Sequence, residues 1–205
     1  PLVDGIVNRF EKEGQRICGP SQAAAMLEGS KRVCKEFLLR NHIPTAPAII
    51  VENDIELARS HVRAHFHDNP DTPIVIKADG LAAGKGVIVA MTLQEAEDAV
   101  RDMLAGNAFG EAGSRVVIEE FLDGEEASFI VMVDGENVLP MATSQDHKRV
   151  GSGDTGPNTG GMGAYSPAPV VTPDVHTRIM NEVIYPTVQG MAAEGHPYKG
   201  FLYAG

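Results

Sequence analysis

The sequence predicts a mixed α/β chain of the α+β type. Residues 48–118 alternate β-branched runs with helical patterns, which is typical of strands and helices packed into one unit. In residues 127–143, two strand-like runs flank Asp134-Gly135, a strong hairpin signal. At 205 residues the chain can bury a substantial core, as one large domain or as two small ones.

The N-terminal residues predict helices followed by a break. Residues 1–20 carry a short helical pattern, and residues 30–40 predict an amphipathic helix capped by Ser30. The cap places Lys31 in the first turn, where a positive charge opposes the helix dipole. Lys31 is therefore either a solvated surface lysine or one retained for another purpose. The prolines within residues 43–47 indicate a subdomain boundary.

Residues 48–118 predict a small α+β subdomain. Its elements in order are strand 48–51, helix 54–67, strand 74–76, strand 87–90, a helix from Thr92 and a closing strand 116–118. Thr92 and Glu95 fit a capping box at the start of the second helix. The apolar positions of that helix make one face: Ala96, Ala99, Val100, Met103 and Leu104.

Residues 119–205 are expected to continue the fold with a hairpin and a last helix. Residues 145–165 are rich in glycine and lack periodicity, which indicates a functional or disordered loop. Thr172 and Pro173 mark the start of a helix that runs towards Gly195, with a kink at Pro186. Residues 198–204 predict a final strand.

A glycine-rich stretch joins two of the predicted strands. Its glycines let backbone N–H groups approach an anion, and Lys77 and Lys85 supply positive charge, so the stretch suits a phosphate. It is not a Walker P-loop, because three residues separate Gly80 from Gly84, and Gly86 takes the place of a Ser or Thr after Lys85. We interpret the stretch as a flap over phosphates. An ordinary hairpin with a glycine-rich tip is the alternative.

The composition restricts the possible partners and the compartment. Seventeen basic residues against 28 acidic ones give a net charge of −11, which argues against general binding to nucleic acid or to a membrane surface. The two cysteines form no CxxC motif, which favours a reducing cytosol. Neither a membrane-spanning run nor a signal peptide is visible, and the chain is expected to be a piece of a longer protein.

Other polar clusters each allow two interpretations. His61, His65 and His67 have helical spacing that could bind a metal, but without a third ligand nearby we expect surface residues. Residues 119–126 could read an adenine edge through the backbone and hold ribose with a carboxylate, or could form a solvated acidic turn. Residues 145–163 could contact a small phosphorylated substrate or form a mobile polar loop.

Five sequence motifs together support one interpretation, because they occur in the same order and at similar spacing in a known family. They are residues 27–31, 77–86, 119–126, 145–149 and 154–165. In these motifs the chain resembles the phosphoribosylamine–glycine ligase (glycinamide ribonucleotide synthetase) family of the ATP-grasp superfamily. The resemblance implies an ATP-grasp fold, in which two α+β subdomains grip ATP between them.

The resemblance also implies a division of the chain and roles for particular residues. Residues 1–46 would end an N-terminal domain and supply a linking helix, 47–118 would form the small subdomain with the flap, and 119–205 would begin the large subdomain. The implied ATP-binding residues are Lys31, Lys77, Gly80, Gly84, Lys85, Gly86, Glu119, Glu120, Phe121, Leu122, Glu126 and Asn158. The implied substrate-binding residues are Asp146, Lys148, Arg149 and Asp154. No catalytic residue is implied, and the ligands of Mg²⁺ or Mn²⁺ are expected just after Gly205.

The activity implied by the resemblance is ATP-dependent ligation of glycine to 5-phosphoribosylamine in purine biosynthesis. Glycyl phosphate would be the intermediate, and the products would be glycinamide ribonucleotide, ADP and phosphate. A cytoplasmic monomer is expected. This piece alone is expected to bind nucleotide without turnover, because the metal ligands and part of the N-terminal domain would lie outside it. The alternatives are another ATP-grasp carboxylate–amine ligase and a nucleotide-binding module without turnover.

Overall fold

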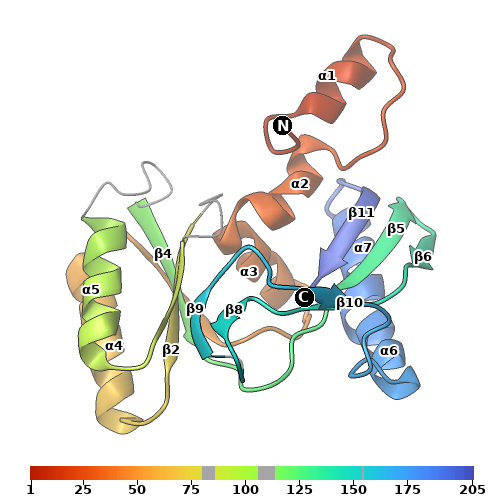
Figure 1. The fold of residues 1–205 in the computed structure, drawn as a ribbon. Helices are drawn as coiled ribbons and strands as arrows, with labels where there is room; N and C mark the ends of the chain where they lie inside the picture. Colours follow the sequence, from red (N-terminus) through yellow and green to blue (C-terminus); the bar gives the residue numbers. More distant parts are fainter. Residues whose placement is uncertain (80–85, 106–113, 154) are drawn as a thin grey trace. The chain divides into compact units, whose positions relative to one another are not determined.

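The computed structural model describes residues 1–79, 86–105, 114–153 and 155–205 (Figure 1). Its contacts divide the chain into two compact units. Unit 1 contains Pro1–Met26, Arg40–Pro44 and Gly124–Gly205, and unit 2 contains Leu27–Leu39 and Thr45–Asp123. The domain boundaries expected after residues 46 and 118 stay predictions.

Unit 2 is built on a four-stranded sheet in which every neighbouring pair is antiparallel. Its strands are β1 (Ala48–Glu52), β2 (Ile74–Ala78), β3 (Val87–Ala90) and β4 (Arg115–Glu120), in the order β1-β4-β2-β3. All four were predicted. Their β-branched residues favour the pleated, half-buried backbone of a sheet, and β2 and β4 lie side by side at its centre.

Two helices cover one face of this sheet, α4 (Ile55–Asp68) and α5 (Leu93–Leu104). Both begin at a capping side chain. The carboxylate of Asp54 accepts the Leu57 N–H at 2.9 Å, and the Thr92 hydroxyl accepts the Glu95 N–H at 3.2 Å. The Glu95 carboxylate accepts the Met91 N–H at 2.8 Å. In the predicted capping box this carboxylate would accept the N–H of Thr92, so the observed bond is made one residue earlier.

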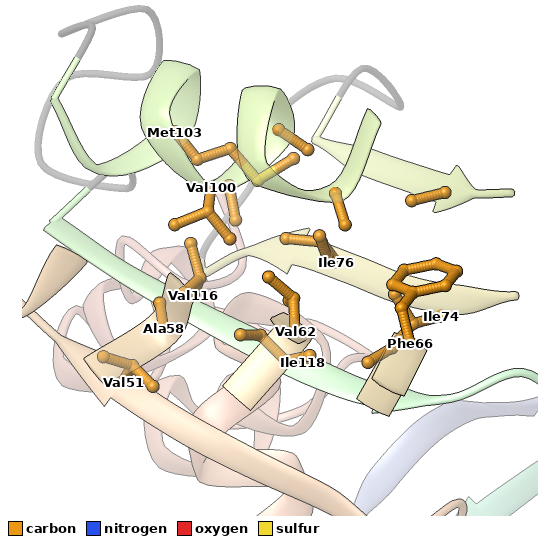
Figure 2. Close-up of a cluster of buried hydrophobic side chains, with 14 residues drawn as sticks. Val51, Ala58, Val62, Phe66, Ile74, Ile76, Val100, Met103, Val116 and Ile118 are labelled. Atoms are coloured by element: carbon orange, nitrogen blue, oxygen red, sulfur yellow. The ribbon is translucent and has the colours of Figure 1, made fainter. Parts of the chain in front are cut away.

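The core of unit 2 lies between the sheet and these two helices, where side chains from β2, β4, α4 and α5 converge (Figure 2). Alternate residues of a strand point to opposite faces. Ile76 and Ile118, which are register partners, therefore enter the core, while Lys77 and Glu119 point to the other face. This alternation sets the position of the charged residues described below.

Three helices precede the sheet: α1 (Ile6–Lys12), α2 (Gln22–Gly29) and α3 (Lys31–Arg40). The Ser30 hydroxyl accepts the Val33 N–H at 3.2 Å, which confirms the predicted cap of α3, and Phe37 is fully buried. Helix α2 was not predicted. It is short and rich in alanine, and without a wide apolar stripe it gives a weak periodic signal even though alanine favours helix.

The central sheet of unit 1 has the order β11-β5-β6 and is antiparallel. Its strands are β5 (Phe129–Asp134), β6 (Val138–Pro140) and β11 (Lys199–Ala204). The predicted hairpin joins β5 to β6, with Gly135 at a φ of +108°. The Asn137 side chain and backbone donate to the Asp134 carboxylate and hold its pKa at about 2.

The last helical region of unit 1 is continuous but irregular. It consists of α6 (Pro173–Ile179), a π-helical turn (Met180–Ile184) and α7 (Tyr185–Ala193). The Thr172 hydroxyl accepts the Val175 N–H at 3.3 Å, as predicted for the cap. The irregularity expected at Pro186 takes the form of the π-helical turn that ends just before it.

The expectation of a loop without regular structure over residues 145–165 was wrong in part. Two small antiparallel pairs lie there. Strand β7 (Gln145–Asp146) pairs with β10 (Ala164–Tyr165), and β8 (Arg149–Gly151) pairs with β9 (Thr155–Asn158). These strands are short and polar, so backbone pairing and side-chain hydrogen bonds stabilise them, and apolar periodicity gives no sign of them.

The described ranges contain no helix that is both long enough and apolar enough to cross a bilayer.

We expect Ile76→Ala to lower the free energy of unfolding by about 2–5 kcal/mol, because it removes a fully buried side chain from the centre of the sheet. Leu57→Ala on α4 is the matched control, since Leu57 is 51% exposed and should change stability by no more than about 0.5 kcal/mol. Urea unfolding followed by circular dichroism measures both. Equal losses would contradict this assignment of the core.

Candidate functional site

Lys77 and Glu119 form an ion pair on the face of the unit 2 sheet that is opposite to α4 and α5. Val117 is the register partner of Lys77, and Glu119 follows it by two residues on the same face of β4. The pair joins Lys77 Nζ to Glu119 Oε1. The Glu119 side chain is only 6% exposed, whereas that of Lys77 is 30% exposed.

A second lysine holds the other oxygen of Glu119. Lys35 Nζ, from α3, lies 2.7 Å from Glu119 Oε2. It also donates to Thr45 Oγ1 at 2.6 Å and to the Ala46 carbonyl at 2.8 Å. An ammonium group has three N–H donors, and Lys35 uses two of them in these hydrogen bonds while its charge pairs with Glu119. Lys77 is more exposed and has donors left over from its pair with Glu119, so it can bind a further acceptor.

The two lysines keep Glu119 ionised. Burial by itself raises the pKa of the Glu119 carboxyl, but the hydrogen bonds and charges of Lys35 and Lys77 outweigh burial. The pKa therefore lies below its usual value. A buried carboxylate normally has to be paired, and here each oxygen has its own cation.

Asp79 is the second buried carboxylate of unit 2, and it lies at the N-terminus of α3. It accepts the Ser30 hydroxyl at 2.9 Å, the Arg32 N–H at 3.2 Å and Arg115 Nη1 at 2.7 Å. Burial alone raises the pKa of Asp79, but these donors hold it below its usual value. Helix α3 has no acidic residue in its first turn, so Asp79 supplies the negative charge that the helix dipole favours there.

Lys31 lies in the same first turn, close enough to Asp79 and Lys77 for their charges to act on it. Burial lowers the pKa of Lys31, the Asp79 charge opposes this change, and the Lys77 charge adds to it. The effect of the Lys77 charge on Lys31 shows that the two lysines lie close together, in a chain of net charge −11. An anion between them would relieve the repulsion, and a phosphate group fits this requirement.

The glycine-rich flap is described only at its end. Gly86 is buried, and its carbonyl accepts the Ala78 N–H at 2.8 Å, next to the ladder of β2 with β3. The predicted flap residues Gly80, Gly84 and Lys85 lie outside the described residues.

The predicted adenine-reading segment begins at the end of β4. Glu119 is buried in its ion pairs, whereas Glu120 is exposed and its N–H donates to the Pro47 carbonyl at 3.0 Å. Phe121 and Leu122 follow the strand, and Leu122 is 64% exposed. Their role towards adenine stays a prediction.

A second charged cluster lies in unit 1. Lys148 Nζ lies 2.7 Å from the Glu126 carboxylate and 3.8 Å from that of Asp146. Burial alone lowers the pKa of Lys148, but the hydrogen bond and charge of Glu126 and the charge of Asp146 raise it overall. The predicted ribose ligand Glu126 is therefore paired with the predicted substrate ligand Lys148.

Arg149 lines a cavity of about 400 Å³ in unit 1. The lining residues are His147, Arg149, Val150, Gly151, Ser152, Gly153 and Met162. Arg149 Nη1 donates to the Gly156 carbonyl at 2.8 Å, which orients the guanidinium. Asp154 lies outside the described residues, and only the backbone of Asn158 is described.

The histidines of α4 do not form a site. His65 Nε2 lies 2.8 Å from the Thr72 carbonyl, and His67 Nδ1 lies 2.8 Å from the Asp68 carboxylate. In the part of the chain that the structure describes, no group of three or more His, Cys, Asp or Glu side chains could hold a metal ion.

Sequence reasoning missed Lys35, Asp79 and Arg115 as members of the site. Lys35 follows Lys31 by one helical turn, and this spacing alone could have placed both on one face of α3. Asp79 stands next to the predicted flap, but its contact with a helix 49 residues earlier leaves no local signal.

We expect Glu119→Gln to lower the free energy of unfolding at neutral pH by about 3 kcal/mol, because it leaves two cations without their shared carboxylate. The Glu119 pKa is depressed in the folded state, so its contribution is complete above the unfolded pKa of about 4.3 and is lost as the pH falls. The difference between wild type and variant should therefore shrink below about pH 4.

Urea unfolding at several pH values measures this difference without adding the salt that guanidinium would bring. Glu120→Gln, one residue further along β4 and exposed, is the control and should change little. A loss that is the same at every pH would show that Glu119 is not stabilised as an anion.

Comparison with known proteins shows the family and the fold of this chain. Residues 29–205 match the family model described as phosphoribosylglycinamide synthetase, ATP-grasp (A) domain. The phosphoribosylamine–glycine ligase of Vibrio vulnificus (strain YJ016) is 74% identical over 205 residues, which is 100% of this chain and 46% of that protein. The crystal structure of the Thermotoga maritima phosphoribosylamine–glycine ligase aligns with a TM-score of 0.79 and 35% identity, over 96% of this chain and 48% of that one.

A more distant structure extends the likeness of fold. D-alanyl-alanine synthetase A from Vibrio cholerae aligns with a TM-score of 0.70 and 15% identity, over 99% of this chain and 59% of that one. The predicted mixed α/β, ATP-grasp fold is confirmed. The chain spans about half the length of the curated relatives that it matches. It belongs to the phosphoribosylglycinamide synthetase family, as the ATP-grasp domain of that family.

Proposed function

We propose that this chain supplies the ATP-binding part of a phosphoribosylamine–glycine ligase. The proposal is carried by the paired lysine site of unit 2, where Lys31 and Lys77 lie near each other and Glu119 holds Lys77. The name of the relative that is 74% identical supports it.

In this reaction the glycine carboxylate attacks the γ-phosphorus of ATP, which forms glycyl phosphate and releases ADP. The amine of 5-phosphoribosylamine then attacks the glycyl carbonyl, the amide bond forms, and phosphate leaves. The product is glycinamide ribonucleotide, an intermediate of purine biosynthesis. The protein must neutralise the phosphate charge, exclude water from the acyl phosphate and align two substrates.

The site of unit 2 suits the first of these tasks. A nucleotide phosphate would compete with Glu119 for Lys77, whose side chain is partly exposed. When Lys77 turns to the phosphate, Lys35 remains 2.7 Å from Glu119, so the buried carboxylate keeps a cation. The exchange therefore avoids the cost of a buried unpaired charge. Lys31 would bind the phosphates from the first turn of α3.

The proposal also gives roles in ligand binding to residues outside the lysine site. Residues 80–86 would cover the phosphates, with Gly80, Gly84, Lys85 and Gly86 as contacts. Residues 119–122 would read adenine, and Glu126 would hold the ribose. Asn158 would lie towards the phosphates, and the substrate side would use Asp146, Lys148, Arg149 and Asp154. No catalytic residue is assigned, because positioning and charge neutralisation supply the catalysis in this scheme.

The proposed reaction also needs a divalent metal ion. ATP-dependent ligation uses Mg²⁺ or Mn²⁺ to neutralise phosphate oxygens. Among the described residues no group of three His, Cys, Asp or Glu side chains converges that could hold the ion by itself. The ion is therefore assigned to none of them.

Localisation and partners follow from the proposed activity. We expect a cytoplasmic monomer whose ligands are ATP, glycine and 5-phosphoribosylamine. The net charge of −11 favours neither nucleic acid nor a membrane surface as a partner.

We expect the full-length protein to sustain ADP release over many turnovers only when glycine and 5-phosphoribosylamine are both present, and to use ATP in preference to GTP. Guanine presents the opposite donor and acceptor pattern to a backbone segment that reads adenine. A coupled assay of nucleoside diphosphate release, with each substrate omitted in turn, tests the proposal. ADP release that does not depend on glycine would contradict the activity, and equal use of GTP would contradict the adenine-reading segment.

We expect Lys77→Met to raise the Kd for ADP by at least about tenfold, because a charge-assisted hydrogen bond contributes about 1.5–3 kcal/mol. Lys85→Met should have a smaller effect, since the sequence places Lys85 in the flap and not in a strand. Titration calorimetry on the full-length protein measures both. Lys12→Met on α1 is the control for loss of an exposed charge. A larger effect at Lys85 than at Lys77 would reverse the two roles.

A further inference from the structure

Helix α3 begins with an electrostatic conflict that a distant residue resolves. Lys31 and Arg32 occupy its first turn, and the turn contains no acidic residue. Both charges oppose the helix dipole. The Asp79 carboxylate lies against this turn, where it accepts the Ser30 hydroxyl at 2.9 Å and the Arg32 N–H at 3.2 Å. A residue at the end of β2 thus completes the cap of a helix that lies 49 positions earlier.

Asp79 is itself held in place by β4. Its N–H donates to the Arg115 carbonyl at 3.0 Å, and its carboxylate accepts Arg115 Nη1 at 2.7 Å. The residue is only 5% exposed, so water cannot easily replace these partners. The backbone of Asp79 is fixed to the sheet, and its side chain is fixed to the helix.

The consequence concerns the two lysines of the site. Lys77 lies two residues before Asp79, next to the end of β2, while Lys31 is the residue that follows Ser30 at the start of α3. The contacts of Asp79 therefore join the strand that carries one lysine to the helical turn that carries the other. Without them, the first turn of α3 would be free to move away from the strand, and Lys31 would move with it.

We propose that Asp79 is a positioning residue for the nucleotide phosphates, which clamps the first turn of α3 to β2 and so fixes the separation of Lys31 and Lys77. This inference rests on the proposed function, because it takes the two lysines as the phosphate ligands. The carboxylate is needed because it accepts several donors and also offsets the charges of Lys31, Arg32 and Arg115. An asparagine could accept some of the hydrogen bonds but could not offset the charges.

The chain contains a matched control for this role. Arg115 uses Nη1 for Asp79 and Nη2 for Glu52, at 2.7 Å in each case. The Glu52 side chain is 56% exposed, and it contacts Arg115 Nη2 and not the Nη1 that binds Asp79. Glu52→Gln therefore breaks an ion pair of the same arginine and leaves the contacts of Asp79 with Ser30 and Arg32 in place.

The test is calorimetric titration of the full-length protein with Mg²⁺ and ADP, together with thermal unfolding in the absence of nucleotide. Asp79→Asn should raise the Kd for ADP by about tenfold, the size expected when one charge-assisted hydrogen bond is misplaced. Asp79→Glu keeps the charge and should recover part of this affinity. Glu52→Gln should leave the Kd within about twofold, a change smaller than one neutral hydrogen bond contributes.

The outcomes separate the inference from the proposed function. If Asp79→Asn lowers the melting temperature but leaves the Kd unchanged, while Lys77→Met raises the Kd, the role of Asp79 is only structural and the inference is overturned. If Lys77→Met also leaves the Kd unchanged, the proposed function fails first. If Asp79→Asn does not fold, Ser30→Ala takes its place, and it should raise the Kd by about threefold. An unchanged Kd in that variant likewise overturns the inference.

Discussion

The carboxylate of Glu119, buried between Lys35 and Lys77, is the interaction on which the rest of unit 2 depends. A buried anion is tolerated only when its charge is paired, and here the two cations come from different elements. Lys77 comes from the neighbouring strand β2, and Lys35 comes from helix α3. The ion pairs can form only if β2 and β4 are adjacent in the observed register and α3 lies on the face opposite to α4 and α5.

A second buried carboxylate, Asp79, also connects α3 to the strands of unit 2, at the N-terminal end of the helix. Glu119 holds α3 through Lys35, near the middle of the helix, and Asp79 holds its first turn through Ser30 and the Arg32 N–H. Two points of attachment fix both the position and the direction of the helix. Positive charges of α3 thus lie close to negative charges of the strands.

The sequence predicted the parts of the fold that depend on periodicity and on local turn chemistry. The four strands of unit 2, the Asp134-Gly135 hairpin and the caps at Ser30, Thr92 and Thr172 follow from such local rules. Helix α2 and the short pairs between β7 and β10 were missed because their residues form no apolar face. In the site, Lys77 was proposed from the glycine-rich stretch beside it and from a resemblance, and Lys31 from the resemblance. The partners Lys35 and Asp79 depend on contacts between distant residues, which local patterns do not encode.

The three contacts of Lys35 have a consequence for how the family can change during evolution. Its ammonium donates to a hydroxyl and a carbonyl and forms an ion pair with a carboxylate. The planar guanidinium of arginine cannot reproduce this tetrahedral arrangement, so the exchange of lysine for arginine is not conservative at this position. Loss of the carboxylate at Glu119 would in turn leave two neighbouring cations to repel each other. Positions 35, 77 and 119 are therefore expected to be inherited as a set, and a homologue that changes one should change the others.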